Sequence, residues 1–256
     1  CCLYIFSPDR KISWDRKWAA FDYENTEKKQ FGYVVTNANN APEFSLLMNS
    51  LSYPWQGLLT WLNDGQMVLY PKSNSYQYPN KLLIYHPVTK QQTEFELRLP
   101  GILSPDKEHE VWDWYNAIYP SIDPTMTRAV YYKWEDPISI HREIVLWDFD
   151  GNKGIWSYSL DTPLYEFELS EPVWSSDGSW FVLVIRDQID SNRVIFIRVF
   201  RDGRQEILNA GVLNQPLNTI AGVSVSPNNR YISFFVFEEG KHHLYILDLV
   251  KNKVWD

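Results

Sequence analysis

Few residues in this sequence have the types and the spacing that catalysis would need. The segment Gly222–Ser226 comes closest to the Gly-x-Ser-x-Gly pattern of serine hydrolases, in which the central serine lies on a turn between a strand and a helix. Its last position is Ser instead of Gly, and no segment with a clean helical period surrounds it. We therefore interpret Gly222–Ser226 as part of an ordinary β-strand.

Metal binding would need clustered His, Cys, Asp or Glu side chains. The five histidines form no His-x-x-x-His pair, and the two cysteines form no larger cluster. The turns Asp148–Asn152 and Asp187–Asp190 carry oxygen ligands that could hold Ca²⁺ weakly, but Asp, Asn and Gly are also the ordinary residues of tight turns. The sequence therefore predicts no metal site and no cofactor.

The segment 100–119 is the most unusual stretch, because it places two Trp and one Tyr beside acidic residues. Its centre consists of Trp112, Asp113, Trp114 and Tyr115. Trp and Tyr supply much of the binding energy in protein interfaces, so these four residues form the candidate binding site. The alternative interpretation is that the aromatic side chains extend a neighbouring strand or cover a gap between sheets.

Composition excludes several classes of protein. Of the 256 residues, 45% are hydrophobic and 16% aromatic, including 12 Trp, which is ample for a folded core and excludes disorder. The 24 basic and 32 acidic residues give a net charge of −8, which argues against a nucleic-acid partner. No apolar run reaches about 18 residues, so we expect no membrane span.

A turn followed by an apolar strand recurs along the whole chain. Its copies begin at residues 6, 61, 122, 174 and 225, which gives spacings of 55, 61, 52 and 51. Ser13–Trp18 is an alternative register for the first of these turns. The clearest copy is the turn Trp174–Trp180, which leads into the strand Phe181–Ile185. A second apolar run starts 19 to 27 residues after each copy begins, and chance apolar runs would not keep that phase. The recurrence therefore indicates an internal repeat.

Each repeat unit has the residues of an antiparallel meander of four strands. Asp-Gly and Asn-Asn favour hairpin turns because they tolerate positive φ, and the flanking runs are rich in β-branched and aromatic residues. No stretch of about ten residues shows a clean helical period. Four-stranded units repeated at this period are typical of a β-propeller, whereas a β-sandwich, the main alternative, would not explain the period.

We therefore predict one all-β domain over residues 1–256, a β-propeller of five four-stranded antiparallel blades. The predicted blades cover approximately residues 1–50, 51–100, 101–165, 166–211 and 212–256. Five such blades either close a ring within the chain or form a segment of a larger ring.

The repeat resembles the WD40-like (PD40) repeats of the TolB and dipeptidyl-peptidase propeller families. The closest copies are Val225–Ile232 with Leu244–Leu249, and Trp174–Trp180. Ile144–Asp148 looks like the Trp-Asp strand end of true WD40 repeats, although their Gly-His dipeptide is missing. The resemblance implies a bacterial, extracytoplasmic protein, whether periplasmic, envelope-associated or secreted. It does not imply one activity, because these blades occur in scaffolds, receptors and enzymes alike.

The start of the chain carries its only cysteines, Cys1 and Cys2, and two adjacent cysteines cannot form a disulfide framework. A chain that begins with Cys instead of Met is expected to be a piece of something longer. Cys1 would suit the lipidated first residue of a bacterial lipoprotein, which a polar spacer should follow. Cys2–Phe6 instead predicts a strand, so buried thiols are the favoured interpretation.

A propeller glycosidase would need two carboxylates in its central funnel. The funnel would be lined by the innermost strands, which we expect at residues 2–6, 57–61, 117–121, 173–175 and 221–225. None of these segments contains Asp or Glu, although Glu171 flanks one of them. Most acidic residues lie in turns, where Asp serves hairpin geometry.

The sequence therefore favours a non-enzymatic propeller module that binds a protein or another ligand through its loops. The expected partner is another protein or a domain of the same longer chain. The alternative is a propeller glycan hydrolase or lyase with carboxylates in the central funnel. A regulatory propeller with a catalytic partner elsewhere in a longer chain is a third interpretation. An enzyme needs converging carboxylates or a metal, whereas a binding module needs only an exposed aromatic patch.

Overall fold

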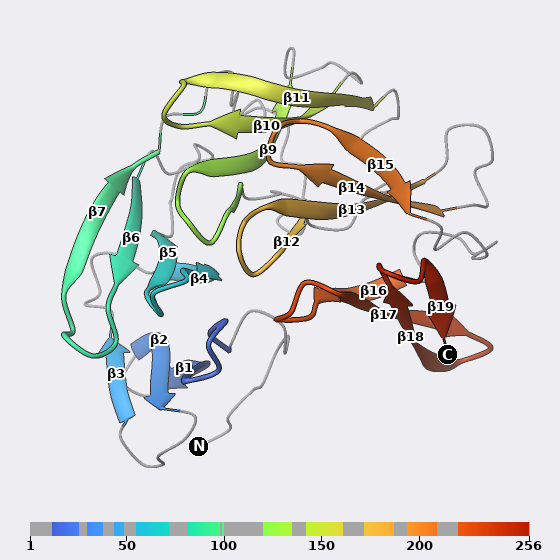
Figure 1. Cartoon of the computed structure of the whole chain (residues 1–256). Coiled ribbons are helices and arrows are strands. Elements are labelled where there is room, and N and C mark those ends of the chain that lie inside the picture. The colour runs from blue at the N-terminus through green and yellow to red at the C-terminus, as the bar shows by residue number, and fades with distance from the viewer. Residues whose placement is uncertain are drawn as a thin grey trace, which may run out of the picture. The chain divides into compact units, whose positions relative to one another are not determined.

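Every regular element that the computed structural model describes is a β-strand, as the sequence predicts (Figure 1). The described residues are 12–25, 30–37, 44–48, 55–71, 81–97, 99, 120–134, 142–160, 172–186, 194–208 and 220–255. The chain divides into two compact units, Cys1–Val111 and Trp112–Asp256, and each is described by itself.

The first unit contains two antiparallel sheets, blades 1 and 2. Blade 1 consists of β1 (Trp18–Asn25), β2 (Gln30–Asn37) and β3 (Phe44–Met48). Blade 2 consists of β4 (Trp55–Trp61), β5 (Met67–Pro71), β6 (Lys81–Tyr85) and β7 (Gln92–Glu96). Blade 1 has three described strands where the repeat predicts four, and a bridge from Ile12 to Ala19 marks the place of its first strand. The repeat turn of blade 1 follows at residues 13–17, so the alternative register is correct and the copy placed at residue 6 is wrong. The strand predicted at Cys2–Phe6 lies outside the described residues.

The second unit contains three four-stranded antiparallel sheets, blades 3 to 5. Blade 3 consists of β8 (Ser121–Ile122), β9 (Arg128–Trp134), β10 (Arg142–Asp148) and β11 (Lys153–Leu160). Blade 4 consists of β12 (Val173–Trp174), β13 (Trp180–Arg186), β14 (Val194–Phe200) and β15 (Gln205–Leu208). Blade 5 consists of β16 (Ile220–Val225), β17 (Tyr231–Glu238), β18 (Lys241–Asp248) and β19 (Lys253–Trp255). In all five sheets the strands pair in chain order, which is the predicted meander.

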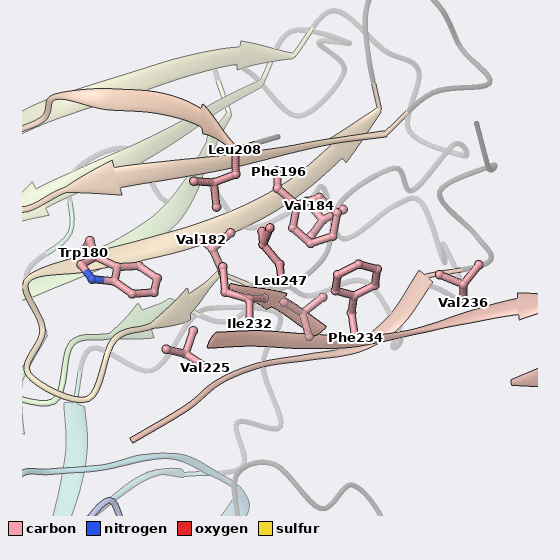
Figure 2. Close-up of a cluster of buried hydrophobic side chains, with 11 residues drawn as sticks. Trp180, Val182, Val184, Phe196, Leu208, Val225, Ile232, Phe234, Val236 and Leu247 are labelled. Atoms are coloured by element: carbon pink, nitrogen blue, oxygen red, sulfur yellow. The ribbon is translucent and has the colours of Figure 1, made fainter. Parts of the chain in front are cut away.

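Blade 4 shows why a nearly continuous apolar run forms a strand here. Residues in a strand alternate between the two faces of the sheet, so Phe181 and Leu183 point one way and Val182 and Val184 the other. Phe181 and Leu183 belong to a buried cluster with blade 3. Val182 and Val184 belong to a second buried cluster, which blade 4 forms with blade 5 (Figure 2). In this cluster the centres of the Phe196 and Phe234 rings lie 4.8 Å apart. Because both faces of blade 4 are covered, both must be apolar.

A common geometry shapes the repeat turn, which joins the first strand of each blade to the second. Its fourth residue has a positive φ in every blade, a conformation that Gly and Asn adopt most easily. These five residues are Arg16, Gly65, Met126, Gly178 and Asn229. The shared geometry explains why Asp-Gly and Asn-Asn recur at this point of the repeat.

In blades 1, 4 and 5 a serine holds the repeat turn. In blade 4, the Trp180 N–H donates to Ser175 Oγ at 3.1 Å, while the Ser175 hydroxyl donates to Asp177 at 2.8 Å. Ser13 and Ser226 make the equivalent pairs of bonds. The side chain thus supplies partners inside the turn that the backbone lacks.

Candidate interaction surface

The meander gives each blade two different ends. At one end, here called the turn end, short turns join the first strand to the second and the third to the fourth. At the opposite end, the loop end, lie the connections between the second and third strands and those that lead to the next blade. The longest of these connections runs from the end of β7 to the start of β8. All long segments between strands are therefore attached at the loop ends.

Carboxylates at the turn end are engaged in holding the turns. Burial raises the pKa of Asp177, but hydrogen bonds from Ser179 and Ser175 outweigh this effect and bring the pKa below its ordinary value. In blade 3, Asp123 replaces the serine of the repeat turn and is fully buried. It accepts the N–H groups of Thr127 and Arg128 at 2.7 and 2.6 Å. These acids have a structural role in the turns.

Asp148 belongs to a turn for which the sequence allowed weak Ca²⁺ binding. Its carboxylate accepts the Gly151 N–H at 3.0 Å and pairs with Arg128 at 3.2 Å. The second such turn, Asp187–Asp190, lies outside the described residues. Among the described residues, no group of three or more His, Cys, Asp or Glu side chains could hold a metal ion.

The segment that partly matches the serine-hydrolase pattern lies in a strand as far as Val225, as predicted, and its last residue, Ser226, begins the repeat turn. Ser224 lies in β16, where it pairs with Ser233 of β17. Gly222 has a φ of 61° and lies within an irregularity of this strand pair, between Ala221 and Ser224. A nucleophilic serine of this class requires a turn from a strand into a helix, and β16 leads into a β-turn and then β17.

The predicted binding residues Trp112, Asp113, Trp114 and Tyr115 lie outside the described residues. They belong to the connection between β7 and β8, and this connection is attached at the loop ends of both strands. Their role in binding stays a prediction.

The hairpin between β17 and β18 carries exposed aromatic side chains that the sequence analysis did not single out. At its tip (Phe237–His242), Phe237 is 45% exposed and its ring centre lies 5.0 Å from that of His242, directly across the strand pair. A chain reversal at Glu239 and Gly240 places this tip at the loop end of blade 5. The sequence feature that could have identified this surface is the run Phe234–Phe237. All four residues are apolar, so both faces of the strand carry apolar side chains.

Further along the same hairpin, Phe235 and Leu244 pair across the strands and are 39% and 46% exposed. Trp255 of β19 is 37% exposed and pairs with Ile246 of β18. The described part of the chain leaves this face of blade 5 open to solvent. Contiguous exposed apolar residues of this kind commonly mark contact surfaces.

No helix in the described part of the chain is long and apolar enough to cross a membrane.

Comparison with known proteins identifies the fold. No protein-family model matches the chain, and no curated protein matches it in sequence. Among solved structures, TolB from Acinetobacter baumannii is 15% identical with a TM-score of 0.55, covering 98% of this chain and 53% of that one. A TolB-type protein from Agrobacterium tumefaciens is 14% identical with a TM-score of 0.56, covering 97% of this chain and 79% of that one.

A third similar structure is itself a propeller domain. It is the β-propeller domain of the Trilobed protease from Pyrococcus furiosus, which is 12% identical with a TM-score of 0.50. The alignment covers 99% of this chain and 84% of that domain. Together with the repeated four-stranded meanders, these similarities show that the chain has a β-propeller fold of the kind found in TolB.

Proposed function

We propose that this chain is a non-enzymatic β-propeller module that binds another protein through the loop ends of its blades. The observation that carries the proposal is the difference between the two ends of each blade. Turns at one end are fastened by their own hydrogen bonds, whereas the other end has the long connections and the exposed hairpin tip. Scaffolds of this kind typically bind through loops that a rigid sheet supports.

The hairpin tip has suitable chemistry for a protein contact. Phe237 and His242 offer two adjacent rings, and Glu238, Glu239 and Lys241, which lie between them in the chain, add charges of both signs to the hairpin tip. An aromatic centre with a polar rim is the usual arrangement of an interface hot spot. The predicted site at Trp112–Tyr115 would add further rings to the same kind of surface.

The proposed partner is another protein, or a domain of the same longer chain. The net charge of −8 is unfavourable for nucleic acid. The likeness to TolB supports a bacterial protein that works outside the cytoplasm, in the periplasm, in the envelope or in secreted form.

Site-specific photo-crosslinking in cells that produce the chain naturally tests this proposal. A photoreactive phenylalanine analogue would replace Phe237 or Trp114. In the matched control it would replace Val250, which is 76% exposed and lies in the turn between β18 and β19, at the turn end of blade 5. We expect discrete protein adducts from positions 237 and 114, and none from position 250. Equal adducts from all three positions, or none, would contradict binding at the loop ends.

The partner identified in such an adduct can then be purified and its affinity measured. Replacing Phe237 by Ser should weaken the complex at least about tenfold, the usual cost of removing a hot-spot aromatic, whereas Val250→Ser should leave it unchanged.

The alternative function, a glycan hydrolase, is tested by a separate assay. Release of new reducing ends from envelope glycans by the purified chain would favour a glycan hydrolase instead.

A further inference from the structure

Two neighbouring histidines of β18, His242 and His243, belong to opposite faces of the β17–β18 hairpin. His243 pairs with Val236 of β17, which is fully buried in the cluster with blade 4 (Figure 2). His242 pairs with Phe237, which is 45% exposed. Both imidazoles are exposed themselves. Because successive residues of a strand point to opposite faces, only His242 shares a face with the exposed aromatic side chains of the hairpin.

The imidazole of His242 lies among carbon groups. Its ring centre is 5.0 Å from that of Phe237 and 6.4 Å from that of Phe235, and the two pairs of ring planes make angles of 51° and 86°. Leu244, two residues further along β18, lies across the strands from Phe235. We call these four residues the tip face. A protein that covers the tip face would remove water from the imidazole together with its apolar neighbours.

The charged side chains of the hairpin and of β19 belong to other places than the tip face. Glu238 and Lys241 pair with each other across the strands, which assigns both to the opposite face. Glu239 is part of the turn itself, with a φ of 49°. Asp248 and Lys253 form a pair on the same side of the sheet as the tip face, but at the turn end of the blade. In the described part of the chain, neither strand therefore supplies a carboxylate beside this imidazole.

These surroundings affect the two charge states of the imidazole differently when a partner binds. Histidine side chains ordinarily change charge at about pH 6.5. In the free chain, the protonated ring keeps its contact with water, and the attraction between a cation and an aromatic face acts already. Under a bound partner, the same charge would lose its water without gaining a carboxylate from this chain, which disfavours the protonated form. The neutral imidazole is therefore the form that suits the complex.

We propose that His242 makes protein binding at the hairpin tip depend on pH, so that the complex forms with the neutral imidazole and is released as the ring becomes protonated. This inference rests on the proposed function, because it concerns the same tip. The partner is a protein that covers the tip face with an apolar surface. A partner that presented a carboxylate to His242 would give the opposite sign, with tighter binding at low pH.

The partner identified by crosslinking at position 237 allows a direct test. Its affinity for the chain should fall about tenfold between pH 7.5 and 5.5, because only a small fraction of the imidazole is neutral at the lower pH. His242→Phe keeps a ring that cannot take up a proton, so its affinity should be the same at both pH values. His243→Phe, the same change on the opposite face, should keep the tenfold loss. Equal or tighter binding of the wild type at pH 5.5, or a loss that persists in His242→Phe, would overturn the proposal.

A second measurement needs no partner and uses Nile red, an uncharged dye that fluoresces on apolar surfaces. The part of its fluorescence that Phe237→Ser abolishes reports dye at the hairpin tip. This part should fall several-fold from pH 7.5 to 5.5 in the wild type and in His243→Phe, but not in His242→Phe. The absence of dye from the tip, or a signal there that does not change with pH, would overturn the proposal.

The two measurements separate this proposal from the proposed function. Discrete crosslinked adducts with an affinity that does not depend on pH would leave binding at the loop ends intact and overturn the role of His242. A pH-dependent dye signal without any adducts would instead contradict only binding of a protein at the loop ends.

Discussion

Arg230 and Asp248 connect the repeat turn of blade 5 to the end of its third strand. Two guanidinium nitrogens of Arg230 donate to the fully buried Asp248 carboxylate at 3.3 and 2.8 Å. The carboxylate also accepts the N–H groups of Val250 and Lys251. Arg230 is the main cause that lowers the pKa of Asp248 from 3.8 to about 2, and the two backbone bonds add to it.

This shift predicts a pH dependence of stability. Because the folded pKa of Asp248 is depressed, its contribution is complete above 3.8 and is lost as the pH falls towards about 2. Asp248→Asn should therefore lower the melting temperature at neutral pH, and the difference from the wild type should shrink over that interval. Asp202→Asn, in an exposed turn, is the control, and thermal melts at several pH values measure both. A difference that does not change with pH would contradict this role of Asp248.

Ser175 is a second residue whose single side chain holds a turn. It is fully buried, accepts the Trp180 N–H and donates to Asp177. Ser175→Ala should cost about 1–3 kcal/mol of unfolding free energy, because it removes partners from a buried N–H and a carboxylate. Ser157→Ala, at an exposed position of β11, should cost little by comparison. Urea unfolding of both variants measures the difference, and equal midpoints would refute the prediction.

At the scale of the element, Gly178 connects a repeat turn to the blade before it. With a φ of 67°, any other residue would be strained, and an added Cβ would lie 2.9 Å from an Asp123 oxygen. Gly240 has a φ of 80° in the β17–β18 hairpin, with no atom within 4 Å of such a Cβ. Gly240→Ala should therefore cost only the conformational strain of about 1–2 kcal/mol. Gly178→Ala should cost more, and equal losses in chemical denaturation would show that the turn contact contributes nothing.

Phe234 belongs to the sheet pair formed by blades 4 and 5. It is fully buried, and its ring lies 4.8 Å from that of Phe196 and 5.7 Å from that of Tyr245. Phe234→Ala should cost about 3–5 kcal/mol, as truncation of a buried aromatic usually does. Urea denaturation followed by circular dichroism measures this loss. A cost below about 1 kcal/mol would mean that the two blades do not share a packed core.

At the scale of the whole molecule, much of the fold is predictable from the sequence, because the repeat is local. Each unit of about fifty residues contains its own turn residue with positive φ and its own apolar runs. The number of blades and the order of their strands therefore follow from the spacing. The turn of blade 2 departs from the pattern, since Leu62 replaces the serine and its N–H bonds to the carbonyl of Gln66, one residue earlier than in the other turns.

The candidate surfaces are less predictable than the fold. Phe234 and Phe235 are neighbours of the same type, and only the cover on each face decides that one is buried and the other exposed. That cover is supplied by another blade, so no local pattern contains it. For the segment around Trp112 and Trp114, the sequence identifies aromatic side chains that suit a protein contact, but it does not identify their surroundings. The binding site there therefore stays a prediction.

The pairing of every described strand with its neighbour along the chain has a consequence for biosynthesis. Each sheet can form its ladder of hydrogen bonds once its own stretch of chain has left the ribosome, without waiting for residues that are translated later. The nascent chain would then acquire structure one blade at a time, from the N-terminus onward. Each newly made blade would present an apolar face, which becomes sheltered only when the next stretch of chain emerges.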